Sequence, residues 1–111
     1  MEKQVALAAL AALAQESRLD VFRLLVRSGP SGLPVGAIAE ALGMPSATLS
    51  FHLKELRSAG LVACRPEGRL RIYAPDFDSV NELLGFLAES CCQGVPKQRR
   101  RRRSRVRSES P

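Results

Sequence analysis

Two adjacent cysteines, Cys91 and Cys92, are the residues of this chain with the clearest capacity for chemistry. Thiolates are soft ligands that select soft or thiophilic ions. The Cα atoms of neighbouring residues are about 3.8 Å apart, whereas a disulfide usually needs roughly 4.4–6.8 Å, so a direct bond between these two sulfurs would be strained. The pair is therefore predicted to chelate one thiophilic ion. The alternative is that both cysteines are small, inert surface residues.

The cellular compartment decides how these thiols behave. The opening stretch, 1–14, lacks the basic start of a signal peptide, and no run of about 18 apolar residues predicts a membrane span. We therefore expect a cytoplasmic protein without a membrane partner, in which cysteines stay reduced. The third cysteine of the 111-residue chain is Cys64. Taken by itself, it is typical of a small buried hydrophobic residue.

A group of polar side chains lies in the stretch 35–60, which has the sequence form of two short helices. In the first, apolar residues recur at helical spacing up to Leu42, and Gly43 is typical of the left-handed residue that ends a helix. Ser46 is predicted as the N-cap of the second helix. The inner stripe of this second helix consists of Leu49, Leu53 and Leu56. Two amphipathic helices joined by such a turn predict a helix-turn-helix.

The remaining side chains of the second helix are predicted to face outward and to contact DNA. They are Ser46, Ala47, Thr48, Ser50, Phe51, His52, Lys54 and Arg57. Residues at the start of such a helix enter the major groove, where polar groups can meet base edges and the Thr48 methyl group can touch a thymine methyl. Lys54 and Arg57 suit phosphates, which position a protein without reading sequence. The alternative is an ordinary solvated helix surface.

A β-hairpin is predicted to follow this helix. Two short, partly alternating runs, 61–65 and 69–74, flank turn residues at 66–68. The expected inner residues are Leu70 and Ile72, and the expected outer ones are Arg69, Arg71 and Tyr73. Together with Arg65, the two outer arginines can reach phosphates or a narrow minor groove. The alternative is a solvated hairpin in which the arginines only prevent other strands from pairing with its edge. A hairpin in this position is the wing of a winged helix.

Three more helices complete the predicted fold, which is mainly α with a β-hairpin wing. They cover 2–14, 18–27 with Ser17 as its N-cap, and a last stretch from Asp76 or Asp78 to about residue 90. The first is rich in Ala and Leu, which are strong helix formers, and its apolar surface is too broad for a free helix. It lies either in the core or, as we favour for a domain this small, against a second subunit of a dimer.

The charge of the chain divides it into two parts. Residues 1–96 carry nine Lys and Arg against ten Asp and Glu, whereas residues 97–111 carry eight against one, which together give the net charge of +6. We therefore predict a winged helix-turn-helix DNA-binding and dimerisation domain over 1–93 and a disordered, basic, Arg-rich tail over 94–111. The tail either tracks DNA phosphates or only keeps the chain in solution.

The chain resembles the ArsR family of small winged-helix metalloregulators over about residues 5–93. Three segments carry the resemblance: AQESRLDVFRLL (14–25), IAEALGMPSATLSFHLKELRSAGLV (38–62) and PEGRLRIY (66–73). The resemblance implies a homodimeric repressor whose first and last helices form the dimer interface. It also implies that the protein leaves its operator DNA, expected to be an inverted repeat, when a metal or metalloid binds. No resident cofactor is implied.

Two ligand sites of the family are missing from this sequence. Pro34 and Gly36 stand where its Cys-x-Cys arsenic site needs thiols, and the last helix has Asp and Glu but no His for a zinc or nickel site. His52 is the single histidine of the chain and belongs to the recognition helix. It is therefore interpreted as a DNA contact or a packed surface group.

The resemblance gives the cysteine pair a specific ligand. Paired cysteines at the end of the last helix, like Cys91 and Cys92, occur in an arsenic-responsive subgroup of the family. An inserted arsenic atom lengthens the bridge between the sulfurs and removes its strain. The implied inducer is arsenite or methylarsenite, with antimonite as a further candidate. Cys64 or the other subunit can supply a third thiolate, whereas an organoarsenical with one carbon substituent needs only two.

Two other functions are consistent with the sequence. One is a thiol-redox regulator in which Cys91 or Cys92 is oxidised. The other is a winged-helix module that binds protein through its helices and nucleic acid, without sequence choice, through its tail. We expect no enzyme activity, because the sequence has no nucleophile–base pair and no phosphate-binding glycine loop.

Overall fold

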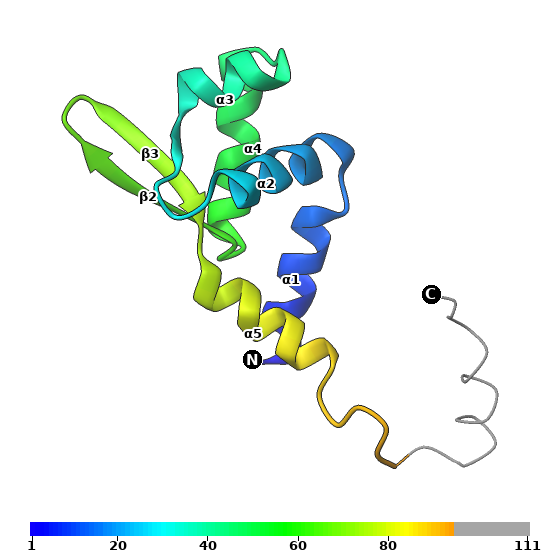
Figure 1. The fold of residues 1–111 in the computed structure, drawn as a ribbon. Coiled ribbons are helices and arrows are strands. Elements are labelled where there is room, and N and C mark those ends of the chain that lie inside the picture. Colours follow the sequence, from blue (N-terminus) through cyan, green and yellow to red (C-terminus); the bar gives the residue numbers. More distant parts are fainter. Residues whose placement is uncertain (95–111) are drawn as a thin grey trace.

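The computed structural model describes residues 1–94, which form five helices and a three-stranded antiparallel sheet (Figure 1). The helices are α1 (Lys3–Leu13), α2 (Glu16–Ser28), α3 (Val35–Leu42), α4 (Ser46–Ser58) and α5 (Phe77–Leu87). The strands are β1 (Leu33–Pro34), β2 (Val62–Glu67) and β3 (Leu70–Pro75), in the order β1-β3-β2. The predicted class, mainly α with a hairpin wing, is confirmed. The predicted tail, apart from Gly94, lies outside the described residues.

The core lies where α2, α3 and α4 pack against one another and against the base of the sheet. Its largest fully buried side chains are Val21, Leu25, Ile38, Leu49, Leu53, Leu56 and Leu61. Burial of one such side chain stabilises the fold by about 1.5–3 kcal/mol relative to its exposure to water. The predicted inner stripe of α4 is therefore confirmed, and it holds this helix at a fixed orientation on the body of the protein.

In the turn between α3 and α4, Gly43 ends the first helix as the sequence predicts. Gly43 has a left-handed backbone (φ 62°, ψ 36°), and the Met44 N–H donates to the Ala39 carbonyl over 3.1 Å. This hydrogen bond satisfies one of the carbonyls that a helix end leaves without a partner. The predicted cap at Ser46 is wrong, because Ser46 is already the first residue of α4 and Pro45 precedes it as the cap. Proline fits there because the start of a helix needs no N–H from it.

The start of α2 also differs from the prediction. The helix begins at Glu16 and its N-cap is Gln15, whose Oε1 accepts a 2.8 Å hydrogen bond from the Arg18 N–H. Ser17 therefore lies inside the first turn and is not the cap. A glutamine side chain is long enough to reach the same backbone donor that a serine cap would satisfy.

The wing corrects two side-chain orientations. Ile72 is buried as predicted, but Leu70 is 53% exposed and Tyr73 is buried. Leu70 lies at the tip of the hairpin, beyond the body of the protein, so nothing covers it. Tyr73 lies at the base of β3, between Leu33 of β1 and Cys64 of β2. Ile72, Tyr73 and Ala74 are consecutive and all buried, so both faces of β3 are covered at its base.

Strand β1 was not predicted, and Gly32 explains how it reaches the sheet. Gly32 has φ +73°, and a Cβ atom at this position would lie 2.6 Å from the Tyr73 carbonyl oxygen and 2.7 Å from Cγ2 of Ile72. Only glycine permits both this backbone conformation and this close approach. The loop after α2 is therefore held directly against β3, which ties the wing to the helical body.

Helix α5 begins at the predicted cap but ends early. Oδ1 of Asp76 accepts a 3.1 Å hydrogen bond from the Ser79 N–H, so Asp76 rather than Asp78 is the cap. The helix ends at Leu87 instead of continuing to about Ser90. Beyond it, Ser90 and Cys92 have positive φ angles of 60° and 69°. Both angles are incompatible with a continued right-handed helix.

The first and last helices lie side by side at one end of the molecule, away from α3 (Figure 1). In α1 the small residues Ala6 and Ala9 face the core. Leu83 of α5 is also buried, whereas six other large apolar residues of the two helices are exposed: Val5, Leu7, Leu10, Phe77, Leu84 and Leu87. Within residues 1–94, no helix is long and apolar enough to span a membrane.

Candidate nucleic-acid interface

The outer face of α4 carries seven of the eight predicted DNA-contacting residues in exposed positions. They are Ser46, Ala47, Thr48, Ser50, Phe51, Lys54 and Arg57. Leu49, Leu53 and Leu56 are fully buried on the opposite side of α4 and fix the rotation of the helix about its own axis. The outer side chains therefore keep one orientation relative to the body of the protein. Such a rigid, exposed helix that follows a tight turn has the form of a recognition helix, which enters the major groove with its first residues.

His52 does not belong to this outer face, and its predicted position is wrong. Its side chain is only 7% exposed. The spacing explains why: Leu49, His52, Leu53 and Leu56 follow the i, i+3, i+4, i+7 pattern of a single helix face. The sequence contained this signal, but a stripe defined by apolar residues alone leaves out the polar member of the pattern.

Arg18 provides the polar partner of the buried His52 side chain. This role of Arg18 was not predicted from the sequence. Its Nη1 lies 3.4 Å from Nδ1 of His52, and its Nε donates a 2.8 Å hydrogen bond to the Ala12 carbonyl. Since arginine can only donate, Nδ1 must accept, which leaves the proton of a neutral imidazole on Nε2. Arg18 thus links the end of α1, the start of α2 and the middle of α4.

The surroundings of His52 favour its neutral form. Burial lowers the pKa of His52, the Arg18 guanidinium lowers this pKa further, and the Glu55 carboxylate raises it in part. The imidazole therefore carries no charge at neutral pH, and it packs without a cost for burying a cation.

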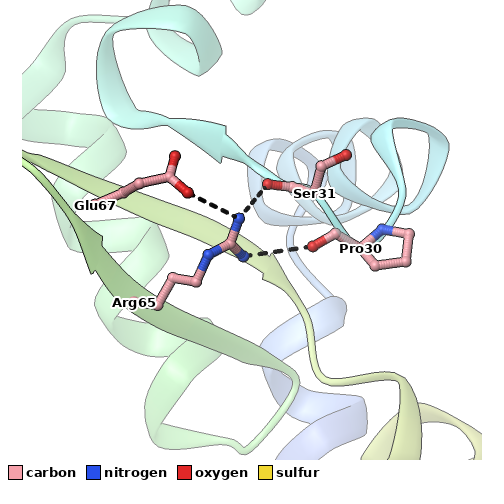
Figure 2. Close-up of polar contacts among 4 residues, drawn as sticks. All are labelled: Pro30, Ser31, Arg65 and Glu67. Atoms are coloured by element: carbon pink, nitrogen blue, oxygen red, sulfur yellow. Dashed lines mark hydrogen bonds and ion pairs between the residues drawn. The ribbon is translucent and has the colours of Figure 1, made fainter.

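The wing arginines have different roles. Arg65 points back to the body of the protein, where its Nη2 donates to the Ser31 carbonyl over 2.7 Å and its Nη1 to the Pro30 carbonyl over 3.4 Å (Figure 2). Glu67 lies beside the same guanidinium at 3.8 Å. Arg65 therefore connects β2 to the loop before β1 instead of projecting toward DNA, and the sequence contained no local signal for this contact.

Arg69 and Arg71 remain exposed on the wing, as predicted. A hydrogen bond with the Tyr73 side chain raises the pKa of Arg71, and Cys64 nearby raises it further. The guanidinium stays charged at any physiological pH. These two arginines give the wing a positive surface beyond the recognition helix, which suits contacts with the phosphate backbone.

The structure brings Cys91 and Cys92 together but leaves Cys64 elsewhere. The two adjacent cysteines are exposed, and their Sγ atoms are 3.2 Å apart. Cys64 lies in the wing, opposite Tyr73 and partly buried against the core. Within residues 1–94, no three His, Cys, Asp or Glu side chains gather as a metal site would require. Cys64 belongs to the wing strand β2 and does not gather with the pair within the described residues of one protomer.

The fold and this surface define a winged helix-turn-helix DNA-binding protein, and comparison with known proteins agrees. A family model described as "Helix-turn-helix domain" matches residues 13–65. The nodulation protein NolR of Rhizobium meliloti is 32% identical over 88 residues, which cover 79% of this chain and 70% of NolR. The transcriptional activator HlyU of Vibrio cholerae is 34% identical over 95 residues, which cover 84% and 85% of the two chains.

Two solved structures extend the similarity to the fold. The winged helix-turn-helix domain Mb0332 of Mycobacterium bovis is described as homodimeric and as a possible ArsR-family transcriptional regulator. It matches with a TM-score of 0.62 and 33% identity over 78% of this chain and 81% of that one. Reduced HlyU of Vibrio cholerae matches with a TM-score of 0.61 and 31% identity over 81% and 92% of the chains.

The chain belongs to the ArsR family of winged helix-turn-helix transcriptional regulators. It is a DNA-binding regulator and not an enzyme. The predicted family membership is therefore confirmed.

Proposed function

We propose that the protein is a cytoplasmic, homodimeric repressor that leaves its operator when a trivalent arsenical binds Cys91 and Cys92. The observation that carries this proposal is the 3.2 Å distance between the two exposed Sγ atoms just beyond α5. The reaction joins each sulfur to arsenic, and each thiol proton leaves with one arsenic-bound hydroxide as water. Two water molecules are therefore released for each methylarsenite bound.

The distance between the sulfurs supports a shared ligand atom. A disulfide bond is about 2.05 Å long, so sulfurs 3.2 Å apart are not bonded to each other. Two thiolates bound to one atom at about 2.3 Å, as they are to zinc, lie roughly 3.3 Å apart when the angle at that atom is near 90°. Pyramidal three-coordinate arsenic has such angles. The pair can therefore bind arsenic with little rearrangement of the sulfurs.

The number of thiolates favours methylarsenite over arsenite. Methylarsenite has one carbon substituent and needs two thiolates, whereas inorganic arsenite can take three. Within the described residues of one protomer, no third Cys or His completes the pair. We therefore propose methylarsenite as the preferred inducer, with arsenite and antimonite binding more weakly unless the second subunit contributes a thiolate.

A homodimer is supported by the exposed apolar face of α1 and α5. Helix α1, with the exposed residues Val5, Leu7 and Leu10, lies beside α5, with the exposed residues Leu84 and Leu87 (Figure 1). Several exposed large apolar side chains on two neighbouring helices are typical of an interaction site. A two-fold dimer through these helices would place two recognition helices in successive major grooves, about 34 Å apart, on an inverted-repeat operator.

The position of the cysteines suggests how the ligand affects DNA binding. The Cys91 N–H donates to the Ala88 carbonyl over 3.0 Å, so the pair lies in a turn directly attached to the end of α5. Ser90 and Cys92 have positive φ angles, a conformation that costs non-glycine residues of order 1–3 kcal/mol. An arsenic atom bound to both sulfurs fixes this turn and shifts the end of α5. The ligand releases DNA only to the extent that it binds the DNA-free form more tightly.

The proposal is tested by fluorescence anisotropy with labelled promoter DNA from upstream of the gene itself. The bound protein is titrated separately with methylarsenite, arsenite, antimonite, zinc and peroxide. We expect methylarsenite to release DNA from the wild type but not from the Cys91→Ser/Cys92→Ser double variant, which binds operator normally. The matched control Cys64→Ser keeps the response. Release of DNA from the double variant by an arsenical would overturn the proposal.

A thiol-redox regulator is a second candidate, because both cysteines are exposed at the end of α5. Peroxide would oxidise the thiol of Cys91 or Cys92 to a sulfenic acid and would itself be reduced to water. In the same titration, release by peroxide together with no response to arsenicals identifies this function.

A further inference from the structure

We propose that Phe51, together with Ala47 and Thr48, recognises the C5-methyl groups of thymine in the major groove. The inference rests on the DNA-binding role of α4 and names a base feature that this helix reads. It makes Phe51 a residue that determines which operator is bound. The proposal depends on three observations: the exposure of Phe51, the inward orientation of His52, and the kinds of side chain at the start of α4.

Phe51 is a large aromatic residue that is exposed on the outer face of α4. Its side chain is 55% exposed, whereas its neighbours His52 and Leu53 are buried on the opposite side of α4. Ala47 and Thr48 precede Phe51 by four and three residues, so their side chains are its neighbours on the helix surface. Both are exposed as well. The two methyl groups and the phenyl ring therefore form one apolar spot on the outer face of the recognition helix.

The inward position of His52 removes the imidazole from the DNA-facing side and supports the phenyl ring. The ring centroids of Phe51 and His52 are 5.7 Å apart, with the planes inclined by 59°. Such tilted pairs are favourable. Arg18 contacts His52 from the interior, so the neighbouring phenyl ring rests on a group that is itself fixed. Phe51 is the aromatic residue that α4 presents outward.

The other outer side chains leave few alternatives for reading bases. Strong hydrogen-bonded readout uses Arg or Lys at guanine and Asn or Gln at adenine. The stretch 46–53 contains none of these four residue types, and the first cation of the helix is Lys54. Ser46 and Ser50 can bond to several different base edges, so they discriminate weakly. A thymine methyl group is the major-groove feature that apolar side chains read, which matches the composition of this helix.

The size of the effect follows from the burial of one methyl group. Removal of one buried methylene-sized group costs about 0.8 kcal/mol, which corresponds to a change of about fourfold in the dissociation constant. Replacement of thymine by deoxyuridine removes this methyl group and leaves all Watson–Crick hydrogen bonds intact. The comparison therefore isolates the methyl contact from every other feature of the operator.

The experiment uses the full chain and a promoter duplex whose protected half-sites are known from footprinting. Each thymine of a half-site is replaced singly by deoxyuridine, and binding is measured by anisotropy at one fixed salt concentration. We expect about fourfold weaker binding by the wild type at one or two positions of each half-site. The Phe51→Ala variant should bind the thymine duplex more weakly and show a smaller difference between thymine and deoxyuridine at these positions, because only Ala47 and Thr48 remain to contact the methyl group.

The control variant is Leu70→Ala, because Leu70 is an apolar residue of similar exposure (53%) on the wing. It should keep the difference between thymine and deoxyuridine. If the wild type bound every deoxyuridine duplex as tightly as the thymine duplex, the inference would be overturned. Undiminished discrimination by Phe51→Ala would overturn it as well. Neither result would contradict operator binding by α4. Failure of the wild type to prefer the promoter over scrambled DNA would instead overturn the role of α4 in reading sequence.

Discussion

Arg18 of α2 and His52 of α4 contact each other inside the protein, with 3.4 Å between Nη1 and Nδ1. The contact joins a residue of α2 to the helix whose outer face is the candidate DNA-binding surface. Arg18 is held in turn by the Ala12 carbonyl, so three helices meet at this point. The orientation of α4 therefore depends on a polar contact as well as on its leucine stripe.

The Arg18–His52 contact predicts a pH-dependent stability. The pKa of His52 in the folded protein is lowered by burial and Arg18, against a smaller opposing effect of Glu55. His52 then binds a proton more readily in the unfolded chain than in the folded protein. The free energy of unfolding is therefore highest above about pH 6.5 and falls as the pH decreases below this value. The fall levels off below the folded pKa. Urea denaturation between pH 5 and pH 8 measures this dependence.

The matched variants for this prediction are His52→Gln and Arg18→Met. His52→Gln should flatten the dependence between pH 5 and pH 6.5. Arg18→Met keeps the aliphatic stem and should raise the pKa of His52, as followed by NMR titration, whereas Arg23→Met on the exposed side of α2 should not. An unchanged pH dependence in His52→Gln would contradict the assignment.

Arg65 is expected to stabilise the wing rather than bind DNA. Arg65→Ala removes the hydrogen bonds to the Pro30 and Ser31 carbonyls and should lower the free energy of unfolding by about 1 kcal/mol. Hydrogen exchange should quicken in β2. Arg69→Ala is the comparison: it should leave stability unchanged, weaken DNA binding and reduce the slope of log affinity against log salt by about 1. A reversed pattern would show that Arg65 is the phosphate contact.

Gly32 and Gly36 form a second matched pair. Gly32→Ala places a methyl group against the Tyr73 carbonyl at a positive φ angle, so we expect a loss of about 1–3 kcal/mol or more in unfolding free energy. Gly36 lies in α3, where an added Cβ atom would meet no neighbouring side chain or distant backbone within 4 Å. Gly36→Ala should stabilise by roughly 0.5–1 kcal/mol. Thermal unfolding of the two variants checks both signs, and equal effects would contradict the close approach of β1 to β3.

The exposed face of α5 is expected to hold the dimer together. Leu84 is 58% exposed in the single chain, and Leu84→Glu would place a charge in the proposed interface. We expect this variant to sediment as a monomer with an unchanged circular dichroism spectrum, and to bind a single half-site only weakly. Leu70→Glu, at the exposed tip of the wing, should remain dimeric. A dimeric Leu84→Glu protein would place the interface elsewhere.

The helix-turn-helix could be predicted from the residues alone, because local periodicity and local backbone chemistry specify it. The leucine stripe of α4, the left-handed Gly43 and the cap at Asp76 all depend on residues within a few positions of one another. The family resemblance depended on the same local runs. Helix boundaries were harder to predict where several residue types could satisfy one backbone donor, as at Gln15 and Ser17.

The polar residues that serve the interior became known only from the packing of distant segments. His52 is buried because Arg18, 34 residues earlier, offers it a hydrogen bond, and Arg65 turns inward because a loop 34 residues before it presents two carbonyls. Tyr73 is covered because β1 pairs with β3 on its far side. In each case the partner is distant along the chain, so no local pattern of residues could reveal it, and the exposure of Phe51 acquires its meaning only once His52 is known to face inward.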